Sequence, residues 1–294
     1  MPRPEAPSPT HRDDHGAALM HATPGLGPAS PETLGAGDGG GAWVPVTTGE
    51  SEAAVFRSAD GARYAKCVLP ADAAGLAAER DRIAWLRGQG VPGATVLAWH
   101  TTDAGACLVT GAVPGVPADQ VPAADLWTAW DNIADAVRAL HELPVGDCPF
   151  HRDLETMATT ARDVVRRGAV NPEFLPEEQR DTPPADLLAR LVPQLARRRE
   201  QEQADPVVCH GDLCLPNIVL DPRTLTVSGF IDLGRLGAAD RHADLSLLLA
   251  NARETWPDEE RAREADAAFA ARYGMPLDGD RLRFYLHLDP LTWG

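Results

Sequence analysis

Three polar side chains interrupt an otherwise apolar stretch of this chain, residues 207–235 ("VVCHGDLCLPNIVLDPRTLTVSGFIDLGR"). Pro216 excludes a regular helix or a central strand at its position, so Asp212 and Asn217 are predicted to lie on a loop. The segments "NIVLD" and "VSGFIDLG" have the pattern of two strands joined by the turn "PRTLT". Because a hairpin brings its two ends together, Asn217 and Asp232 become neighbours although they are well separated along the chain.

These side chains suit a site that handles phosphate. The oxygen atoms of Asn217 and Asp232 are ligands of the kind that Mg²⁺ prefers, and Mg²⁺ commonly accompanies a bound phosphate. Asp212 lies beside this pair, where a base or an orienting group for an attacking hydroxyl is expected. Taken singly, Asp212 could equally cap a turn, and Asp232 could equally cap a helix.

A lysine and a glutamate upstream extend the pattern. Of the 27 basic residues only Lys66 is a lysine, which suggests a position that needs a compact point charge. Alternation in "RYAKCVL" places Lys66 on a strand, and "AGLAAERDRIAWLRGQG" is predicted to be a helix with Leu76, Ile83 and Leu86 on its apolar face. Glu79 falls on that same face, which is unfavourable for a carboxylate without a cationic partner. Because Lys66 and Glu79 accompany Asp212 and Asp232, the joint pattern argues against a simple turn or helix cap at either aspartate.

The chain is predicted to consist of a tail and two lobes. Residues 1–41 are rich in Pro, Gly, Ala and Ser and lack apolar periodicity, which predicts a disordered tail. Residues 42–113 have the pattern of strands around one helix, a small β-rich nucleotide-binding lobe, and "GAVPGVP" at 111–117 is the predicted hinge. Residues 114–294 form the predicted catalytic and substrate-binding lobe, which completes an α+β fold. Its helices are predicted near 123–142, 185–203, 242–254, 259–273 and 279–288.

Composition limits which binding partners and which cellular compartment are expected for this protein. The net charge of −16 argues against nucleic acid and suits a small cationic partner, although acidity by itself also keeps a protein soluble. No apolar run of about eighteen residues is present to span a membrane. The N-terminal residues lack a signal-peptide pattern, so we expect a cytoplasmic protein. The five cysteines are expected to be reduced.

The segments "HGDLCLPN" and "FIDLGR" resemble the catalytic loop and the metal-binding segment of the aminoglycoside phosphotransferases, which are relatives of the protein kinases. The resemblance implies a bilobal protein-kinase-like fold with Asp212 as the catalytic residue. It also implies that Asn217 and Asp232 hold Mg²⁺. The chain has "HGD" where protein kinases have His-Arg-Asp, and "IDL" where they have Asp-Phe-Gly, which argues against a protein kinase.

The same resemblance assigns the nucleotide-binding residues. Lys66 would contact the α- and β-phosphates of ATP, and Glu79 would hold Lys66 by an ion pair. The loop "TTGESEAAVF" would cover the phosphates, with Ser51 as one contact. The segment at 111–117 would present its backbone to the adenine ring.

Further motifs narrow the resemblance to the streptomycin 3''-phosphotransferases. They are "WVPVTTGES", "ERDRIAWL", "AVNPEFLPEE", "IDLGRLGAADRHADL" and "FYLHLDPLTWG". These enzymes transfer the γ-phosphate of ATP to the 3''-hydroxyl of streptomycin, which inactivates the antibiotic. An acceptor with guanidinium groups should be held by carboxylates, and the candidates are Asp240, Glu254, Asp289 and the α-carboxylate of Gly294. The resemblance supports Glu254 and Asp289, but each acid could equally be a surface group or a helix cap.

The sequence leaves three alternatives open. The acceptor could be another aminoglycoside, as in the 3'-phosphotransferases, or a small metabolite alcohol. The chain could also be an inactive kinase-like binding protein, but a binder has no need of all five residues Lys66, Glu79, Asp212, Asn217 and Asp232. The oligomeric state, monomer or dimer, is left open by the sequence.

Overall fold

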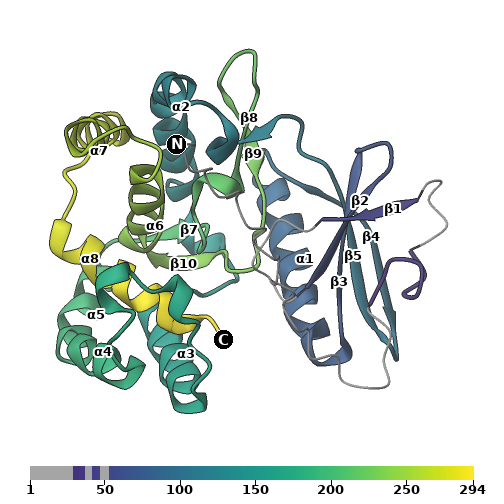
Figure 1. Ribbon diagram of the computed structural model, residues 1–294, viewed down its shortest axis with the longest axis horizontal. Helices are drawn as coiled ribbons and strands as arrows, with labels where there is room; N and C mark the ends of the chain where they lie inside the picture. The colour runs from purple at the N-terminus through teal and green to yellow at the C-terminus, as the bar shows by residue number, and fades with distance from the viewer. Residues whose placement is uncertain (1–28, 37–41, 47–52) are drawn as a thin grey trace, which may run out of the picture.

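The computed structural model describes residues 29–36, 42–46 and 53–294, which form two lobes (Figure 1). The smaller lobe holds an antiparallel sheet and one long helix, and the larger lobe is mostly helical. This confirms the predicted α+β architecture. Ser51 and most of the predicted tail lie outside the described residues. None of the helices in the described part of the chain is both long and apolar enough to cross a membrane.

The sheet of the small lobe has five antiparallel strands in the order β1-β2-β3-β5-β4. Alternation along β3 places Lys66 on one face and Cys67 on the other, and Cys67 is buried. The strands are β1 (Trp43–Pro45), β2 (Ala54–Ser58), β3 (Arg63–Val68), β4 (Thr95–Thr102) and β5 (Gly105–Gly111).

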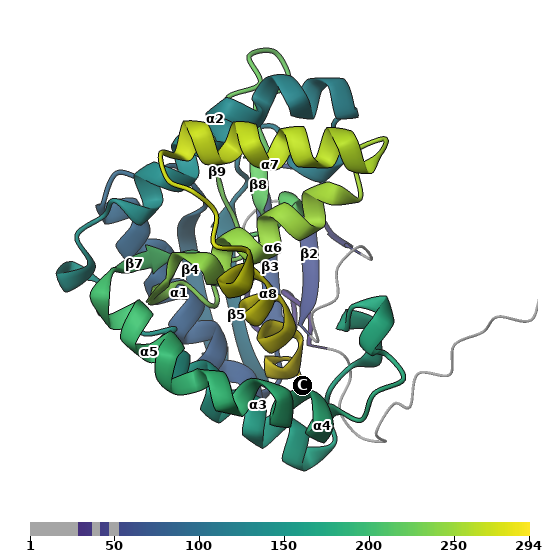
Figure 2. The same cartoon turned by 90° about the vertical axis from the view of Figure 1, so that its left-hand side faces the viewer.

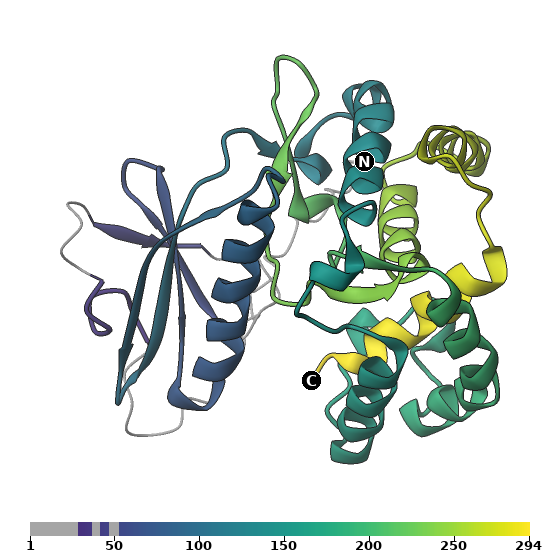
Figure 3. The same cartoon turned by 180° about the vertical axis from the view of Figure 1, so that it is seen from behind.

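Helix α1 (Ala73–Gly88) lies between this sheet and the large lobe, as Figures 1 and 3 show. It buries Leu76, Ile83 and Leu86, which confirms the predicted apolar face. Glu79 is buried on that face as well. The sequence therefore identified both the helix and the carboxylate that it carries towards the sheet.

A short segment before β1 covers the opposite face of the sheet. We call residues 29–36 the strap. Leu34 and Ala36 of the strap are buried, and they belong to one apolar cluster with Cys67 and Cys107. The prediction of a disordered tail is wrong for this segment, because its few apolar side chains find a preformed apolar surface that no local pattern reveals.

Four of the predicted helices of the large lobe are confirmed to within two residues. Helices α2 and α7 pack against each other, and α6 packs against α8. Their bounds are α2 (Ala123–His141), α6 (Arg241–Arg253), α7 (Glu259–Tyr273) and α8 (Gly279–Leu288).

Two helical segments differ from the prediction. The predicted helix near 185–203 is divided into α4 (Pro184–Leu191) and α5 (Leu195–Ala204), because Pro193 lies between them in a 3-10 turn. Helix α3 (Leu154–Arg167) was not predicted at all. Its buried residues recur at helical spacing, so the sequence does carry a signal for this helix: Leu154, Met157, Ala158, Ala161 and Val164. Figure 2 shows α3, α4, α5 and α8 gathered below α6.

The large lobe also holds two small sheets. In one, β6 (Val116–Pro117) pairs with β8 (Ile218–Leu220), and β8 pairs with β9 (Val227–Phe230), which confirms the predicted hairpin. In the other, β7 (Pro206–Cys209) pairs with β10 (Gly237–Asp240). Short 3-10 turns complete the described chain: η1 (Pro70–Asp72), η2 (Ala118–Gln120), η3 (Val145–Asp147), η4 (Pro172–Phe174), η5 (Glu177–Gln179), η6 (Val192–Gln194), η7 (Leu215–Asn217) and η8 (Asp289–Thr292).

The two lobes share one apolar core. It includes Leu86 of α1 and Leu108 of β5 together with Ile133 of α2 and Leu248 of α6. A division into lobes at 42–113 and 114–294 remains our proposal. It is supported by the end of β5 at Gly111, after which β6 pairs with the large lobe.

The backbones of the lobes also touch directly at two glycines. Phe230 N donates to Pro92 O at 3.2 Å, and Gly93 forms an isolated parallel bridge with Phe230. A Cβ atom on Gly229 would lie 2.7 Å from Cα of Gly93, so a side chain does not fit between the lobes here. This contact fixes the strand that leads to Asp232.

We predict that Gly229→Ala lowers the free energy of unfolding by about 1–3 kcal/mol, because the added methyl group forces two backbones apart. Thermal and urea unfolding measure the effect. Gly75→Ala in α1 is the matched control, since its Cβ would meet nothing within 4 Å, and it should be neutral or slightly stabilising. Equal unfolding midpoints for both variants would show that the lobes do not depend on this contact.

Candidate active site

A lysine of the small lobe reaches an acid of the large lobe. The Nζ atom of Lys66 lies 2.9 Å from Oε2 of Glu79, so the predicted ion pair is present. The same Nζ lies 3.2 Å from Oδ1 of Asp232, which follows β9. Lys66 and Asp232 therefore face a common space between the lobes.

Electrostatics keep Lys66 charged at this position. Burial disfavours the ammonium form, but the nearby carboxylates of Glu79 and Asp232 outweigh burial and raise the pKa of Lys66. The ammonium is a compact donor that binds both acids at once. A guanidinium is broader and planar, which explains why an arginine-rich chain has a lysine here.

The catalytic loop, residues 210–217, brings Asp212 and Asn217 together. Nδ2 of Asn217 donates to the backbone oxygen of Asp212 at 2.8 Å and to its Oδ2 at 3.1 Å. The backbone oxygen of Asn217 accepts from Ile231 N at 3.0 Å. Asn217 is thus joined to the residue before Asp232, as the predicted hairpin requires.

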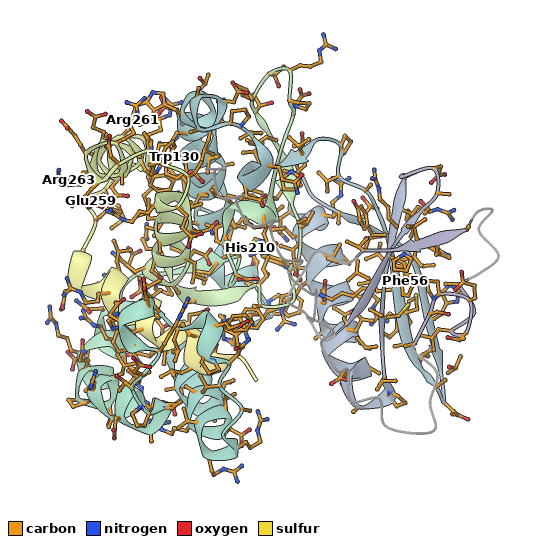
Figure 4. All side chains as sticks on the ribbon, viewed as in Figure 1. Phe56, Trp130, His210, Glu259, Arg261 and Arg263 are labelled. Atoms are coloured by element: carbon orange, nitrogen blue, oxygen red, sulfur yellow. The ribbon has the colours of Figure 1, made fainter. Side chains whose placement is uncertain are left out.

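His210 links the catalytic loop to the segment that carries Asp232. Its ring is fully buried, with Nε2 2.9 Å from Ile231 O and Nδ1 3.3 Å from Asp212 N. These contacts require a neutral ring that donates from Nε2 and accepts at Nδ1. The ring also packs edge-on against Phe230. His210 is therefore structural, and Figure 4 labels it near the junction of the lobes.

Helix α6 anchors the loop through two side chains. Asp244 is fully buried and accepts from His210 N at 2.6 Å and from Gly211 N at 2.8 Å. Oδ1 of Asn251 accepts from Leu215 N at 2.9 Å. Asp244 and Asn251 therefore anchor the loop to α6.

Asp232 and Asn217 fit a magnesium ion chemically. The side chain of Asp232 is 45% exposed, and one of its oxygens is bonded to Lys66. Asn217 uses its amide nitrogen within the loop, which leaves its amide oxygen as a possible ligand. Asp232 also has a left-handed backbone with φ of 58°, which is uncommon for a residue other than glycine and typical of functional sites. Both side chains offer the hard oxygen donors that Mg²⁺ prefers.

Asp212 has the environment of a base. Burial raises the pKa of its carboxyl group, and the nearby charges of Asp289 and Asp232 raise it further, against the opposing charge of Arg235. A carboxylate with a raised pKa accepts a proton more readily than a free aspartate does. It can therefore orient a hydroxyl and take its proton.

The C-terminal residues 289–294 lie beside Asp212, and we call them the C-terminal wall. Arg235 donates from Nη1 to Oγ1 of Thr292 at 3.0 Å and from Nη2 to the Thr292 backbone oxygen at 3.1 Å. Its guanidinium carbon lies 3.3 Å from the centroid of the Trp293 ring. Burial and the neighbouring Arg152 lower the pKa of Arg235 to about 10, so it stays charged at neutral pH. These contacts indicate a structural role for Arg235.

Asp289 is bonded within this wall. Its Oδ1 accepts from Arg152 Nη2 at 3.0 Å, and its Oδ2 accepts from Trp293 Nε1 at 2.9 Å. The residue is buried. Arg152 follows a loop and has no neighbouring sequence motif, so nothing local indicated its partnership with an acid near the chain end.

Among the other acids predicted to hold the acceptor, Asp240 has a different place. It is fully buried and accepts from the backbone and ring nitrogens of His242 at 2.9 and 2.8 Å and from Arg281. The prediction for Asp240 is therefore wrong, because the residue caps α6 inside the lobe and both of its oxygens have internal partners. Glu254 is exposed at the C-cap of α6, one turn beyond Asn251. The backbone oxygen of Gly294 accepts from Arg167 Nη2 at 3.0 Å.

Comparison with known proteins agrees with this geometry. The phosphotransferase enzyme family (APH) matches residues 42–285. The streptomycin 3''-kinase of Streptomyces griseus is 73% identical over 275 residues, which cover 94% of this chain and all of that protein. An aminoglycoside 3'-phosphotransferase of Streptomyces fradiae is 41% identical and covers 84% of this chain and 94% of its own length.

A solved structure is similar over almost the same range. The aminoglycoside phosphotransferase APH(3'')-Id from Streptomyces rimosus, in complex with ADP and streptomycin, has a TM-score of 0.86 and 62% sequence identity. The match covers 90% of this chain and 97% of that one.

We predict that Asp212→Asn lowers kcat by at least about 100-fold, the range expected when a general base is removed, while ATP binding is nearly unchanged. The amide keeps the size of the side chain but loses its negative charge and its basicity. Steady-state kinetics and isothermal titration with ATP separate the two effects. Asp103→Asn, in an exposed loop, is the control. Turnover close to wild type in Asp212→Asn would exclude the base role.

We also predict that Lys66→Arg impairs the enzyme despite keeping the charge, because a guanidinium cannot occupy the narrow space between Glu79 and Asp232. The expected effect is a rise of roughly tenfold or more in KM for ATP or an equivalent loss in kcat/KM, since at least one of two charge-assisted bonds is lost. Arg87→Lys, on the exposed end of α1, is the matched control. Full activity of Lys66→Arg would contradict the claim that this position requires the compact charge of a lysine.

Proposed function

Because this chain belongs to the phosphotransferase enzyme family, we propose that it uses ATP to phosphorylate the 3''-hydroxyl of streptomycin. Such a reaction inactivates the antibiotic and would give resistance to it. The observation that carries the enzymatic part is the contact of Lys66 with Asp232 across the lobes, next to Asp212. An inactive binding protein has no reason to keep a charged lysine, two acids and a base at one junction.

The residues divide the reaction between them. Lys66 neutralises charge on the ATP phosphates, and Glu79 holds Lys66 in place. Asn217 and Asp232 would hold Mg²⁺, which supplies further charge neutralisation on the phosphates. Asp212 orients the acceptor hydroxyl and takes its proton, so most of the rate enhancement comes from alignment and electrostatics.

Streptomycin as the acceptor is supported by similarity and by charge. The relative named streptomycin 3''-kinase matches over its whole length, and the similar solved structure contains ADP and streptomycin. The acceptor carries guanidinium groups, which suits a chain of net charge −16. Glu254 is our first candidate for holding them, because it is exposed near the catalytic loop. The terminal carboxylate of Gly294 is a further candidate in the C-terminal wall, whereas Asp289 would have to release Arg152 or Trp293, which already bind its two oxygens.

The proposal includes two properties of the working enzyme. We place it in the cytoplasm, where ATP is available. We also propose that it acts on a small cationic drug without a nucleic acid or membrane partner. Whether one or two copies form the active particle is left to measurement by light scattering.

The proposed reaction is tested by following ADP release with streptomycin, kanamycin and neomycin as acceptors, with Asp212→Asn as the blank. We expect turnover with streptomycin and none above the blank with the other two. Mass spectrometry and phosphorus NMR of the product should place the phosphate on the 3''-oxygen. Preferred turnover of kanamycin or neomycin would identify a 3'-phosphotransferase. Absence of turnover with all three drugs would overturn the proposed antibiotic substrate.

A further inference from the structure

Two buried thiols face each other in the small lobe. Cys67 of β3 and Cys107 of β5 are direct partners in the sheet register, and their Sγ atoms lie 3.1 Å apart. Directly opposed residues of antiparallel strands have Cα atoms about 4.5–5.5 Å apart. A disulfide spans roughly 4.4–6.8 Å between Cα atoms, so the backbone already holds the pair within bonding range. We propose that Cys67 and Cys107 form a reversible disulfide that links β3 to β5.

A low-molecular-weight disulfide, such as oxidised glutathione, is the co-reactant. One cysteine thiolate attacks a sulfur of the oxidant, forms a mixed disulfide and releases one glutathione thiolate. The second cysteine thiolate then attacks the protein sulfur of the mixed disulfide and releases the second glutathione. The two cysteines lose two protons and two electrons, and the oxidant becomes two molecules of reduced glutathione. Excess dithiol reverses both steps.

The strap controls access to this pair. Leu34 and Ala36 cover the two thiols, and both cysteines are buried beneath them. Within the described residues, the backbone hydrogen bonds of the strap join its own members, such as Leu34 N to Ser30 O. Apolar contact therefore holds the strap on the sheet. Lifting it exposes the thiols without breaking a strand pairing.

The position of the pair predicts what the disulfide does. Alternation along β3 puts Cys67 on the strap side and Lys66 on the side of α1. The new bond would tie the strand that carries Lys66 to its neighbour without entering the nucleotide site. A cross-link between segments far apart in the chain stabilises mainly by restricting the unfolded state. We therefore expect a more stable lobe with unchanged catalytic groups.

The test uses the full-length protein under native conditions. It is incubated with oxidised glutathione, blocked with iodoacetamide and digested, and peptides are mapped by mass spectrometry. We expect a peptide pair linked through Cys67 and Cys107, a loss of two of the five free thiols, and a melting temperature higher by several degrees. Dithiothreitol should restore all three readouts. Turnover should change less than twofold.

Three variants complete the design. Cys107→Ser should lose the linked peptide and the thermal shift, whereas Cys148→Ser, a buried cysteine without a cysteine partner, should keep both. Leu34→Ala should speed formation of the disulfide several-fold by loosening the strap. The proposal is overturned if Cys67 and Cys107 stay unlinked in the wild type, or if they pair with other cysteines. A lower or unchanged melting temperature of the linked form would overturn its stabilising role. The peptide map of the wild type decides the first point even where a variant fails to fold.

Discussion

The reacting groups of this protein depend on one buried carboxylate, that of Asp244. The catalytic loop has little regular secondary structure, so its backbone amides need a fixed acceptor, and Asp244 accepts from His210 and Gly211. Burial opposes the charge on Asp244, but its hydrogen bond with His141 and these amides outweigh burial and lower its pKa. Removing a partner from such a buried charge typically costs about 3–5 kcal/mol. The loop is therefore held by a hydrogen-bond network in which the donors offset the free-energy cost of burying the Asp244 charge.

The loop transmits this fixed position to the metal-binding segment. His210 bonds Ile231 through its ring, and Asn217 bonds the same residue through its backbone oxygen. Two contacts on one residue fix both the place and the direction of the chain just before Asp232. Asp232 then meets Lys66 of the other lobe. The base, the metal ligands and the phosphate-binding lysine thus form one connected unit, although they come from three separate parts of the sequence.

The parts of this site that follow local rules could be predicted from the sequence. A proline, a hairpin pattern and a carboxylate on an apolar helix face indicated Asp212, Asn217, Asp232 and the pair of Lys66 with Glu79. The acids further along the chain could not be assigned in the same way. The sequence neighbours of Asp240 are like those of a surface acid. Only the fold reveals that His242 and Arg281 bind its two carboxylate oxygens. The strap could not be predicted because its burial comes from partners distant in sequence. Helix α3 was missed although its buried residues recur at helical spacing.

Two arginines, Arg152 and Arg235, lie near the base Asp212 in a protein whose acceptor is cationic. The contacts of the C-terminal wall explain why they do not repel the acceptor. A free guanidinium beside Asp212 would repel a drug that itself carries guanidinium groups. Arg152 is bonded to Asp289, and Arg235 is bonded to Thr292 and stacked on Trp293, so both charges are used within the protein. Their attraction to Asp212 and Asp289 instead holds the end of the chain against the catalytic loop. The two arginines are therefore structural. The exposed carboxylates that remain give the surface a negative potential, which attracts an incoming cation.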